Sequence, residues 1–150
     1  MFAKGVNNVE NVRIYLSGGM SNLTIEEQMR WRNRFRDAIR FGEHDITKKP
    51  IFFSPPDYYS PSTNEHKSER EAMEFELANL RKSDLVVVNF NVPQSIGTAM
   101  ELMVAKENRI PIIGLNKDGK KLHPWLIECC TRMCDDFREL VNHVVEFYLK

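Results

Sequence analysis

Glu101 is the residue of this chain whose type and surroundings point most directly to chemistry. It is a carboxylate between the apolar residues Met100 and Leu102, in the segment SIGTAMELMVA. Helical side chains lean toward the N-terminus, so Glu101 can point back toward the start of its helix, where Gly97 leaves room for a ligand. A solvated glutamate on an outer helix face is the simpler interpretation of this residue taken alone.

Glu76 is a second carboxylate that does not fit the outer face of a helix. It follows Met73 by three residues and precedes Leu80 by four, so it shares or borders the apolar stripe of its helix. If Glu76 and Glu101 face one pocket, their environments can separate their pKa values. One would then be an ionised nucleophile and the other a protonated acid, as in retaining glycosidases. The alternative role for Glu76 is a single hydrogen bond between helices.

Several residues near these glutamates could bind a ligand. Ser95 is suited to cap the Glu101 helix, and it could hold a phosphate or hydroxyl together with the free N–H groups of the next two residues. Ser17, Gly18 and Gly19 follow a predicted strand, and two glycines there suit close approach to a phosphate or sugar. Helix capping and a tight turn explain the same residues equally well.

Aromatic residues offer further candidates. Tyr15 lies in the predicted strand before the glycines, a position typical of a core aromatic side chain. Tyr58 and Tyr59 lie in a long polar segment after a strand, where they could stack on a base or simply be exposed.

The elements that must position these residues alternate between strands and helices. Short apolar, β-branched runs predict strands at Val12–Leu16, Ile51–Ser54, Asp84–Phe90 and Ile110–Leu115, with a short fifth within Glu128–Met133. Helical periodicity and capping residues predict helices from Asn22 or Thr24 to Gly42, and over Ser68–Lys82, Ser95–Asn108 and Asp135–Leu149. This order predicts a single α/β domain over residues 1–150, flavodoxin-like or Rossmann-like, with a five-stranded parallel sheet and helices on both faces.

Parallel sheets of this kind bind ligands beyond the carboxyl ends of their strands, where the strand order reverses. That rule selects the loops at 17–22, 54–64 and 91–97 as the walls of a binding crevice. Glu101 follows the last of them directly.

Composition limits the partners. Lysine plus arginine and aspartate plus glutamate each number 21, so no net charge attracts a nucleic-acid polymer. The three cysteines, Cys129, Cys130 and Cys134, are an odd number in a crowded segment, which disfavours disulfides and has no recognisable zinc spacing. We therefore expect no metal and no other cofactor. No apolar run has the length of a signal peptide or membrane span, which predicts a soluble, cytoplasmic protein without a membrane partner.

Three segments together carry a resemblance to a known family. The sequences RIYLSGGM, FELANLRKSDLVVVNF and SIGTAMELMVAKENRIPIIG resemble the nucleoside 2-deoxyribosyltransferase family and its nucleotide N-hydrolase relatives. The likeness extends from about Val12 to Met133, and its most specific part is the Gly-x-x-x-Glu-Leu pattern that ends at Glu101 and Leu102. The resemblance implies that Glu101 is a nucleophile that forms a covalent glycosyl-enzyme, and that Tyr15 positions its carboxylate.

Departures from the family pattern bear on which class of substrate the protein would bind. At the position of Glu76 the family usually has an aspartate, which is implicated in proton transfer to the leaving base. Transferases of free nucleosides tend to have an aspartate at the position of Ser95 and an asparagine from a neighbouring subunit at that of Thr131. Two neutral hydroxyls suit a phosphate dianion better than an aspartate does. The chain thus looks more like the branch that hydrolyses nucleoside 5′-monophosphates, and the resemblance implies that Thr131 and Met133 complete a site in a homodimer or larger homo-oligomer.

These observations predict cleavage of the N-glycosidic bond of a small-molecule (deoxy)nucleoside or its 5′-monophosphate, with transfer to water or to another nucleobase. Two other classes stay open. One is a non-catalytic nucleotide-sensing module on the same fold, in which Glu101 only binds a ribose hydroxyl. The other is a structural protein descended from such an enzyme.

Overall fold

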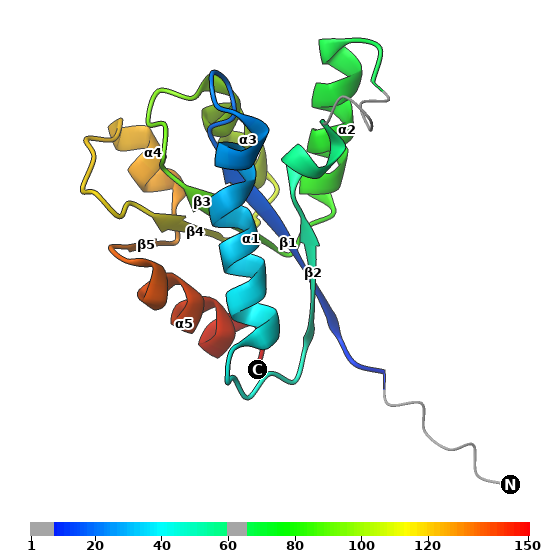
Figure 1. Ribbon diagram of the computed structural model, residues 1–150, viewed down its shortest axis with the longest axis vertical. Helices are drawn as coiled ribbons and strands as arrows, with labels where there is room; N and C mark the ends of the chain where they lie inside the picture. The colour runs from blue at the N-terminus through cyan, green and yellow to red at the C-terminus, as the bar shows by residue number, and fades with distance from the viewer. Residues whose placement is uncertain (1–7, 60–65) are drawn as a thin grey trace, which may run out of the picture.

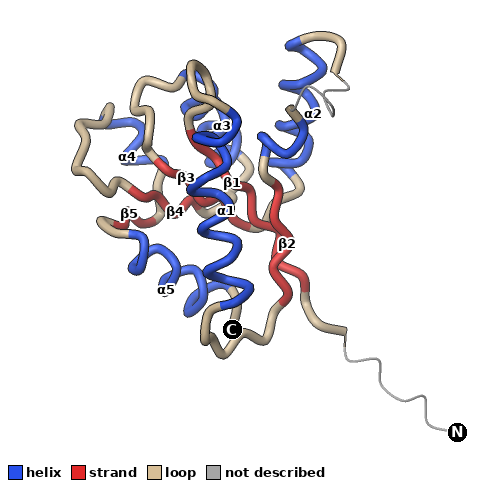
Figure 2. Tube along the Cα trace, viewed as in Figure 1, coloured by secondary structure: helices blue, strands red, loops and turns tan. Residues whose placement is uncertain are grey.

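The computed structural model describes residues 8–59 and 66–150 of the chain. Strands and helices alternate along the described residues, as the sequence predicts (Figures 1 and 2). The strands are β1 (Asn11–Gly18), β2 (Lys49–Phe53), β3 (Leu85–Asn89), β4 (Ile112–Leu115) and β5 (Arg132–Cys134). The helices are α1 (Ile25–Phe41), the 3₁₀ helix η1 (Pro55–Tyr58), α2 (Glu69–Arg81), α3 (Ile96–Glu107), α4 (Pro124–Cys129) and α5 (Phe137–Tyr148).

The five strands form one parallel sheet in the order β2-β1-β3-β4-β5, which confirms the predicted flavodoxin-like arrangement. The chain runs from β1 outward to β2 and then returns to the other side of β1 to form β3. In the register of β1 and β3, Gly18 lies opposite Asn89, so both strands end at the same level. The strand order therefore reverses between β1 and β3, and the expected ligand crevice lies beyond their carboxyl ends.

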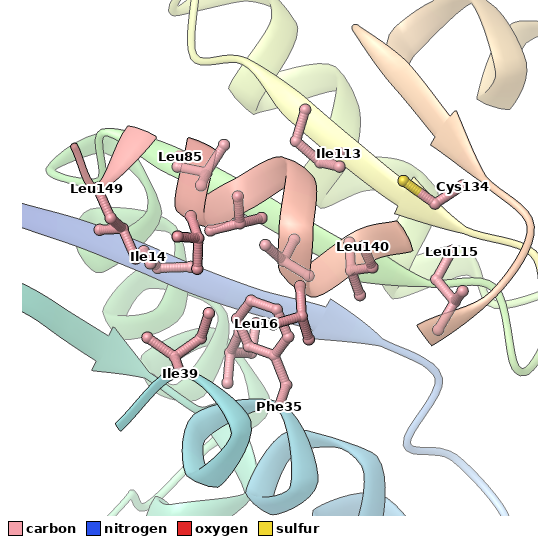
Figure 3. Packing of buried hydrophobic residues seen from close by; sticks show 14 of the residues in the cluster. Ile14, Leu16, Phe35, Ile39, Leu85, Ile113, Leu115, Cys134, Leu140 and Leu149 are labelled. Atoms are coloured by element: carbon pink, nitrogen blue, oxygen red, sulfur yellow. The ribbon is translucent and has the colours of Figure 1, made fainter. Parts of the chain in front are cut away.

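Two apolar cores cover the two faces of the sheet. On one face, Ile14, Leu16 and Leu85 pack under α1 and α5 (Figure 3). On the other face, Tyr15 and Val86 pack under α2, α3 and α4. Alternate residues of β1, β3 and β4 are buried on opposite faces, which explains why these strand sequences are largely apolar.

The fifth strand begins only near the end of the segment Glu128–Met133 in which it was predicted. Glu128 and the residue after it belong to α4, and β5 begins at Arg132. Pro124 occupies the first turn of α4, where a missing N–H costs nothing, and the His123 side chain accepts a hydrogen bond from the Trp125 N–H. These capping groups start a short helix where the apolar residues alone favoured a strand.

Helix α1 buries a face that includes polar residues. Thr24 caps it in a reciprocal capping box with Glu27, which decides between the two predicted caps. Its buried side chains are those of Gln28, Arg32, Phe35 and Ile39, and Arg32 is completely buried. Arg32 thus places a charged side chain within the buried face of this helix, and its partners lie at the site described below.

The segment after β2 is only partly a loop. Pro55–Tyr58 form η1, and residues 60–64 of the predicted crevice wall lie outside the described residues. None of the helices in the described part of the chain combines the length and the apolar character needed to cross a membrane. Within residues 8–59 and 66–150, no group of His, Cys, Asp and Glu side chains is arranged to hold a metal ion, and the three cysteines carry free thiols.

Candidate active site

A cleft of about 750 Å³ lies at the carboxyl ends of β1 and β3, between α2 and α3. This is the side of the sheet that α2, α3 and α4 cover, and the position agrees with the expected crevice. The walls come from the loop after β1, the segments before α2, and the facing sides of the two helices. Its lining includes Gly18, Met20, Ser21, Tyr59, His66, Lys67, Ser68, Met73, Glu76, Ser95, Gly97, Met100 and Glu101.

Glu101 contributes a buried carboxylate to this cleft. Helix α3 begins at its cap Ser95, whose side chain accepts the Thr98 N–H, and Leu102 is buried against the sheet. This orientation turns Glu101 into the cleft, and its Oε2 atom is buried without a well-formed hydrogen bond to any described residue. Burial raises the pKa of Glu101 to about 8; the Tyr15 hydroxyl and the Arg32 charge counteract this rise, and the Glu76 charge adds to it.

Tyr15 lies beneath Glu101 on β1 and is fully buried. Its ring stacks on that of Phe53, with 5.2 Å between centroids. Burial, followed by the nearby charges of Glu101 and Glu76, raises the pKa of the Tyr15 hydroxyl well above its ordinary value. The hydroxyl therefore keeps its proton, and it lacks a well-formed partner among the described residues. The Tyr15 hydroxyl can therefore donate a hydrogen bond to the Glu101 carboxylate and stabilise its ionised form.

Glu76 on α2 is half-buried and lines the same cleft. Burial raises its pKa, while a hydrogen bond from Tyr59 and the charges of Arg32 and His66 counteract the rise. The electrostatic coupling between Glu76 and Glu101 means that ionising one carboxyl disfavours ionising the other. An ionised Glu76 therefore favours the protonated form of Glu101.

Arg32 is the site residue that the sequence analysis missed. Its guanidinium donates to the carbonyls of Leu16 (3.2 Å) and Gly18 (3.1 Å) at the end of β1, and to that of Gln28 (2.6 Å). None of the described acidic residues forms an ion pair with it. Burial lowers its pKa to about 10, with Glu101 the largest opposing influence, so it is a cation at neutral pH. The sequence feature that could have indicated a role for Arg32 is its charge within the apolar stripe of a predicted helix.

The two glycines at the end of β1 differ in role: one lines the cleft, and the other allows close packing of two loops. Gly18 lines the cleft. A Cβ atom on Gly19 would lie 2.5 Å from the Cβ of Val92, and the Gly19 N–H donates to the Asn91 side chain at 3.0 Å. Gly19 is therefore required where the loops after β1 and β3 meet. Ser17 is fully buried in β1, its hydroxyl has no partner among the described residues, and it is not one of the residues lining the cleft.

Ser95 and Gly97 both lie at the cleft, where α3 begins. The Ser95 hydroxyl accepts from the Thr98 N–H (3.2 Å) and from its side chain (2.9 Å). A Cβ atom on Gly97 would meet nothing within 4 Å, so this position opens onto free space. The space beside the helix start can receive a ligand group that accepts hydrogen bonds from free backbone N–H groups.

Besides Ser17 and Gly19, three more candidate binding residues do not line this cleft. Tyr58 packs on Phe53, with ring centroids 5.1 Å apart, and its neighbour Tyr59 lines the cleft instead. The Thr131 hydroxyl accepts the Ile112 N–H at 3.2 Å, and Met133 lies in β5 at the far edge of the sheet. Within one chain, Thr131 and Met133 are therefore not among the residues that line the cleft.

The structure thus places a buried carboxylate beside a tyrosine, and a second carboxylate in the same cleft at the switch point of a parallel α/β sheet. Solved structures share this fold. The 2-deoxyribosyltransferase of Bacillus psychrosaccharolyticus superposes with a TM-score of 0.67 and 17% identity, over 87% of this chain and 91% of that protein. The CMP N-glycosidase BcmB of Clostridium botulinum superposes with a TM-score of 0.57 and 15% identity, over 91% and 99%.

A conserved protein from Enterococcus faecalis V583 superposes with a TM-score of 0.72 and 17% identity, over 90% of this chain and 98% of that one. No protein-family model matches the sequence, and no curated protein matches it. At these identities the likeness concerns the fold. The chain has the fold of the nucleoside 2-deoxyribosyltransferases.

Proposed function

We propose that this protein cleaves the N-glycosidic bond of a (deoxy)nucleoside or its 5′-monophosphate through a covalent intermediate on Glu101. The observation that carries the proposal is the pairing of Glu101 and Glu76 in one cleft, with Tyr15 beneath the first. Two carboxylates with different surroundings can divide nucleophilic and acid–base roles. The fold shared with a deoxyribosyltransferase and a CMP N-glycosidase adds support.

The proton balance of the pair follows from its electrostatics. In the empty cleft, Glu101 holds a proton near neutral pH, because burial raises its pKa to about 8. Glu101 passes this proton to Glu76 and then attacks C1′. The C1′–N bond breaks, its electron pair goes to the base, and Glu76 protonates the departing nitrogen.

The second half of the reaction restores the site. Water attacks C1′, Glu76 accepts the proton of the water, and the bond between C1′ and Glu101 breaks. The proton then returns from Glu76 to Glu101. An acceptor nucleobase in place of water gives transfer instead of hydrolysis, and neither route requires a metal.

A nucleoside 5′-monophosphate is the substrate class we favour. The start of α3 offers the Ser95 hydroxyl and backbone N–H groups, and Lys67 lines the same cleft. Neutral donors, a helix N-terminus and a lysine all stabilise a phosphate dianion. Ser17, Tyr58 and Gly19 do not line the cleft, so in this proposal they support its walls and do not bind substrate.

A second copy of the chain is part of the proposal. Ile96, Met100 and Met103 are exposed at i, i+4 and i+7 on α3, directly beside the cleft. An apolar stripe of this kind is typical of a surface that another protein covers. A homodimer through this surface would bring residues of the partner, with Thr131 and Met133 as the candidates, toward the mouth of the cleft.

Incubation with a panel of deoxynucleosides and their 5′-monophosphates, with and without an acceptor base, tests the activity. We expect base release from monophosphates, and a mass increase of one glycosyl group on the peptide that contains Glu101 when turnover is quenched. Replacement of Glu101 by Ala should reduce base release by about a thousandfold or more. The control is Glu107→Gln, at an exposed position of the same helix. Full activity of the Glu101→Ala variant would refute the nucleophile assignment.

One observation favours a second candidate, a nucleotide-binding module without turnover. A protonated Glu101 can donate a hydrogen bond to a ribose hydroxyl, and its raised pKa favours that form in the empty cleft. Nucleotides that raise the melting temperature without any base release would support this alternative.

A further inference from the structure

Two consecutive tyrosines at the end of η1 point to different places. Tyr58 is part of the aromatic packing under the segment, with its ring 5.1 Å from that of Phe53 and 5.0 Å from that of Phe75. Tyr59 lines the cleft together with Glu76, and its hydroxyl lies where it can donate a hydrogen bond to the Glu76 carboxylate. Tyr58 therefore anchors the segment, and Tyr59 reaches one of the two acidic groups of the site.

The segment that presents Tyr59 is fixed to the rest of the domain. Pro55 and Pro56 are buried, and the Asp57 carboxylate accepts two hydrogen bonds from Arg36 on α1, at 2.8 and 3.3 Å. Anchoring on two sides reduces the conformational entropy that the Tyr59 side chain loses when it bonds to Glu76. The fold therefore holds Tyr59 near Glu76 before any ligand binds in the cleft.

We propose that Tyr59 is a positioning residue for Glu76, whose hydroxyl holds the Glu76 carboxylate in the cleft that it shares with Glu101. This inference rests on the proposed function, in which Glu76 carries the proton between Glu101 and the departing base. A carboxylate on a glutamate side chain has several rotatable bonds, and a directed O–H donor selects the rotamers that face the cleft.

The charge of Glu76 depends on several groups that face it. Burial raises its pKa; Tyr59, Arg32 and His66 counteract the rise, and Glu69 adds to it. Glu101 is also coupled to it across the cleft. Among these groups Tyr59 is the uncharged donor, so its removal changes one hydrogen bond and no net charge. Loss of the hydroxyl should therefore raise the pKa of Glu76 further.

The test compares Tyr59→Phe with Tyr58→Phe, a matched pair that removes one hydroxyl from each of two adjacent rings. The side-chain carboxyl of Glu76 is followed by NMR in ¹³C-glutamate-labelled protein, and Glu76→Gln assigns its signal. We expect Tyr59→Phe to move the titration of Glu76 upward by about half to one pH unit, and Tyr58→Phe to leave it unchanged. Equal titration curves in Tyr59→Phe and in the unmodified protein would overturn the proposal, as would equal shifts in both variants.

A reciprocal measurement covers the case in which Tyr59→Phe does not fold. Glu76 raises the pKa of Tyr59 through its hydrogen bond and its charge, after burial as the main cause. Replacement of Glu76 by Gln should therefore lower the pH at which Tyr59 ionises, followed by ¹⁹F NMR of fluorotyrosine-labelled protein. An unchanged Tyr59 titration would contradict the contact.

These titrations separate the two hypotheses. Absence of base release from every nucleotide, with the Glu76 titration still shifted by Tyr59→Phe, would reject the proposed function and keep the contact. If the protein is active, Tyr59→Phe should also move the acid limb of kcat/KM to higher pH by the same amount, with Tyr58→Phe as control. An acid limb that stays in place would reject the positioning role.

Discussion

Replacement of Glu101 by Gln should make the protein more stable at alkaline pH and leave it almost unchanged at acid pH. The pKa of the Glu101 carboxyl rises from 4.5 to about 8 on folding, with burial as the main cause. The folded state therefore holds its proton more tightly than the unfolded state does. Between these two pH values the unfolded state binds fewer protons, so the free energy of unfolding falls as pH rises.

The size of this loss of stability follows from how far folding raises the pKa of Glu101. Each pKa unit corresponds to about 1.36 kcal/mol, so the ionisation of Glu101 removes about 5 kcal/mol of stability by the time the pH exceeds about 8. Small domains have roughly 5–15 kcal/mol in total, so the effect is large. In a chain of this length, about 5 kcal/mol displaces the melting temperature by roughly 10–20 °C.

Urea unfolding of both proteins at about pH 5 and about pH 9 measures the effect. The difference in unfolding free energy between Glu101→Gln and the unmodified protein should grow by several kcal/mol in favour of the variant as pH rises. Glu107→Gln, at an exposed site of the same helix, is the control and should show no such growth. A difference that is equal at both pH values would refute the burial of an ionisable Glu101 and with it the electrostatic basis of the site.

Further predictions concern the neighbours of Glu101 and the pH dependence of activity. Arg32→Met should lower stability by about 3–5 kcal/mol in urea unfolding, because it leaves buried carbonyls without a donor and Glu101 without its cation; a loss under about 1 kcal/mol would contradict this. Gly19→Ala should cost about 1–3 kcal/mol through collision with Val92, and a neutral result in thermal melts would show that the loops can separate. Gly97→Ala should stabilise α3 by up to about 1 kcal/mol and still weaken nucleotide binding in calorimetry, since the new methyl enters the cleft; unchanged affinity would place the ligand elsewhere. Base release should slow as pH rises through about 8, where the pair loses the proton that Glu101 holds, and a rate that keeps rising above that pH would contradict the proton assignment.

Local sequence patterns predicted most of the fold because the strands are buried on both faces. Leu85–Asn89 is continuously apolar up to Asn89, and a short β-branched run of this kind is typical of a parallel strand that is buried on both faces. The start of α1 at Thr24 was also readable, since a capping box is made by residues three apart. The weakest prediction was the fifth strand, where Pro124 and the His123 cap begin a short helix inside an apolar segment.

The sequence by itself determined the alternation of strands and helices and the presence of two carboxylates on helices that flank β3, because these depend on residues close together in the chain. Only the tertiary structure decided that Arg32 is buried under the end of β1 and that Tyr59, not Tyr58, faces Glu76. It also decided that Ser17 is buried and does not line the cleft. The physical reason is that burial and electrostatic coupling depend on which segments distant in sequence pack together. Neither quantity is encoded in the spacing of residues along one helix or strand.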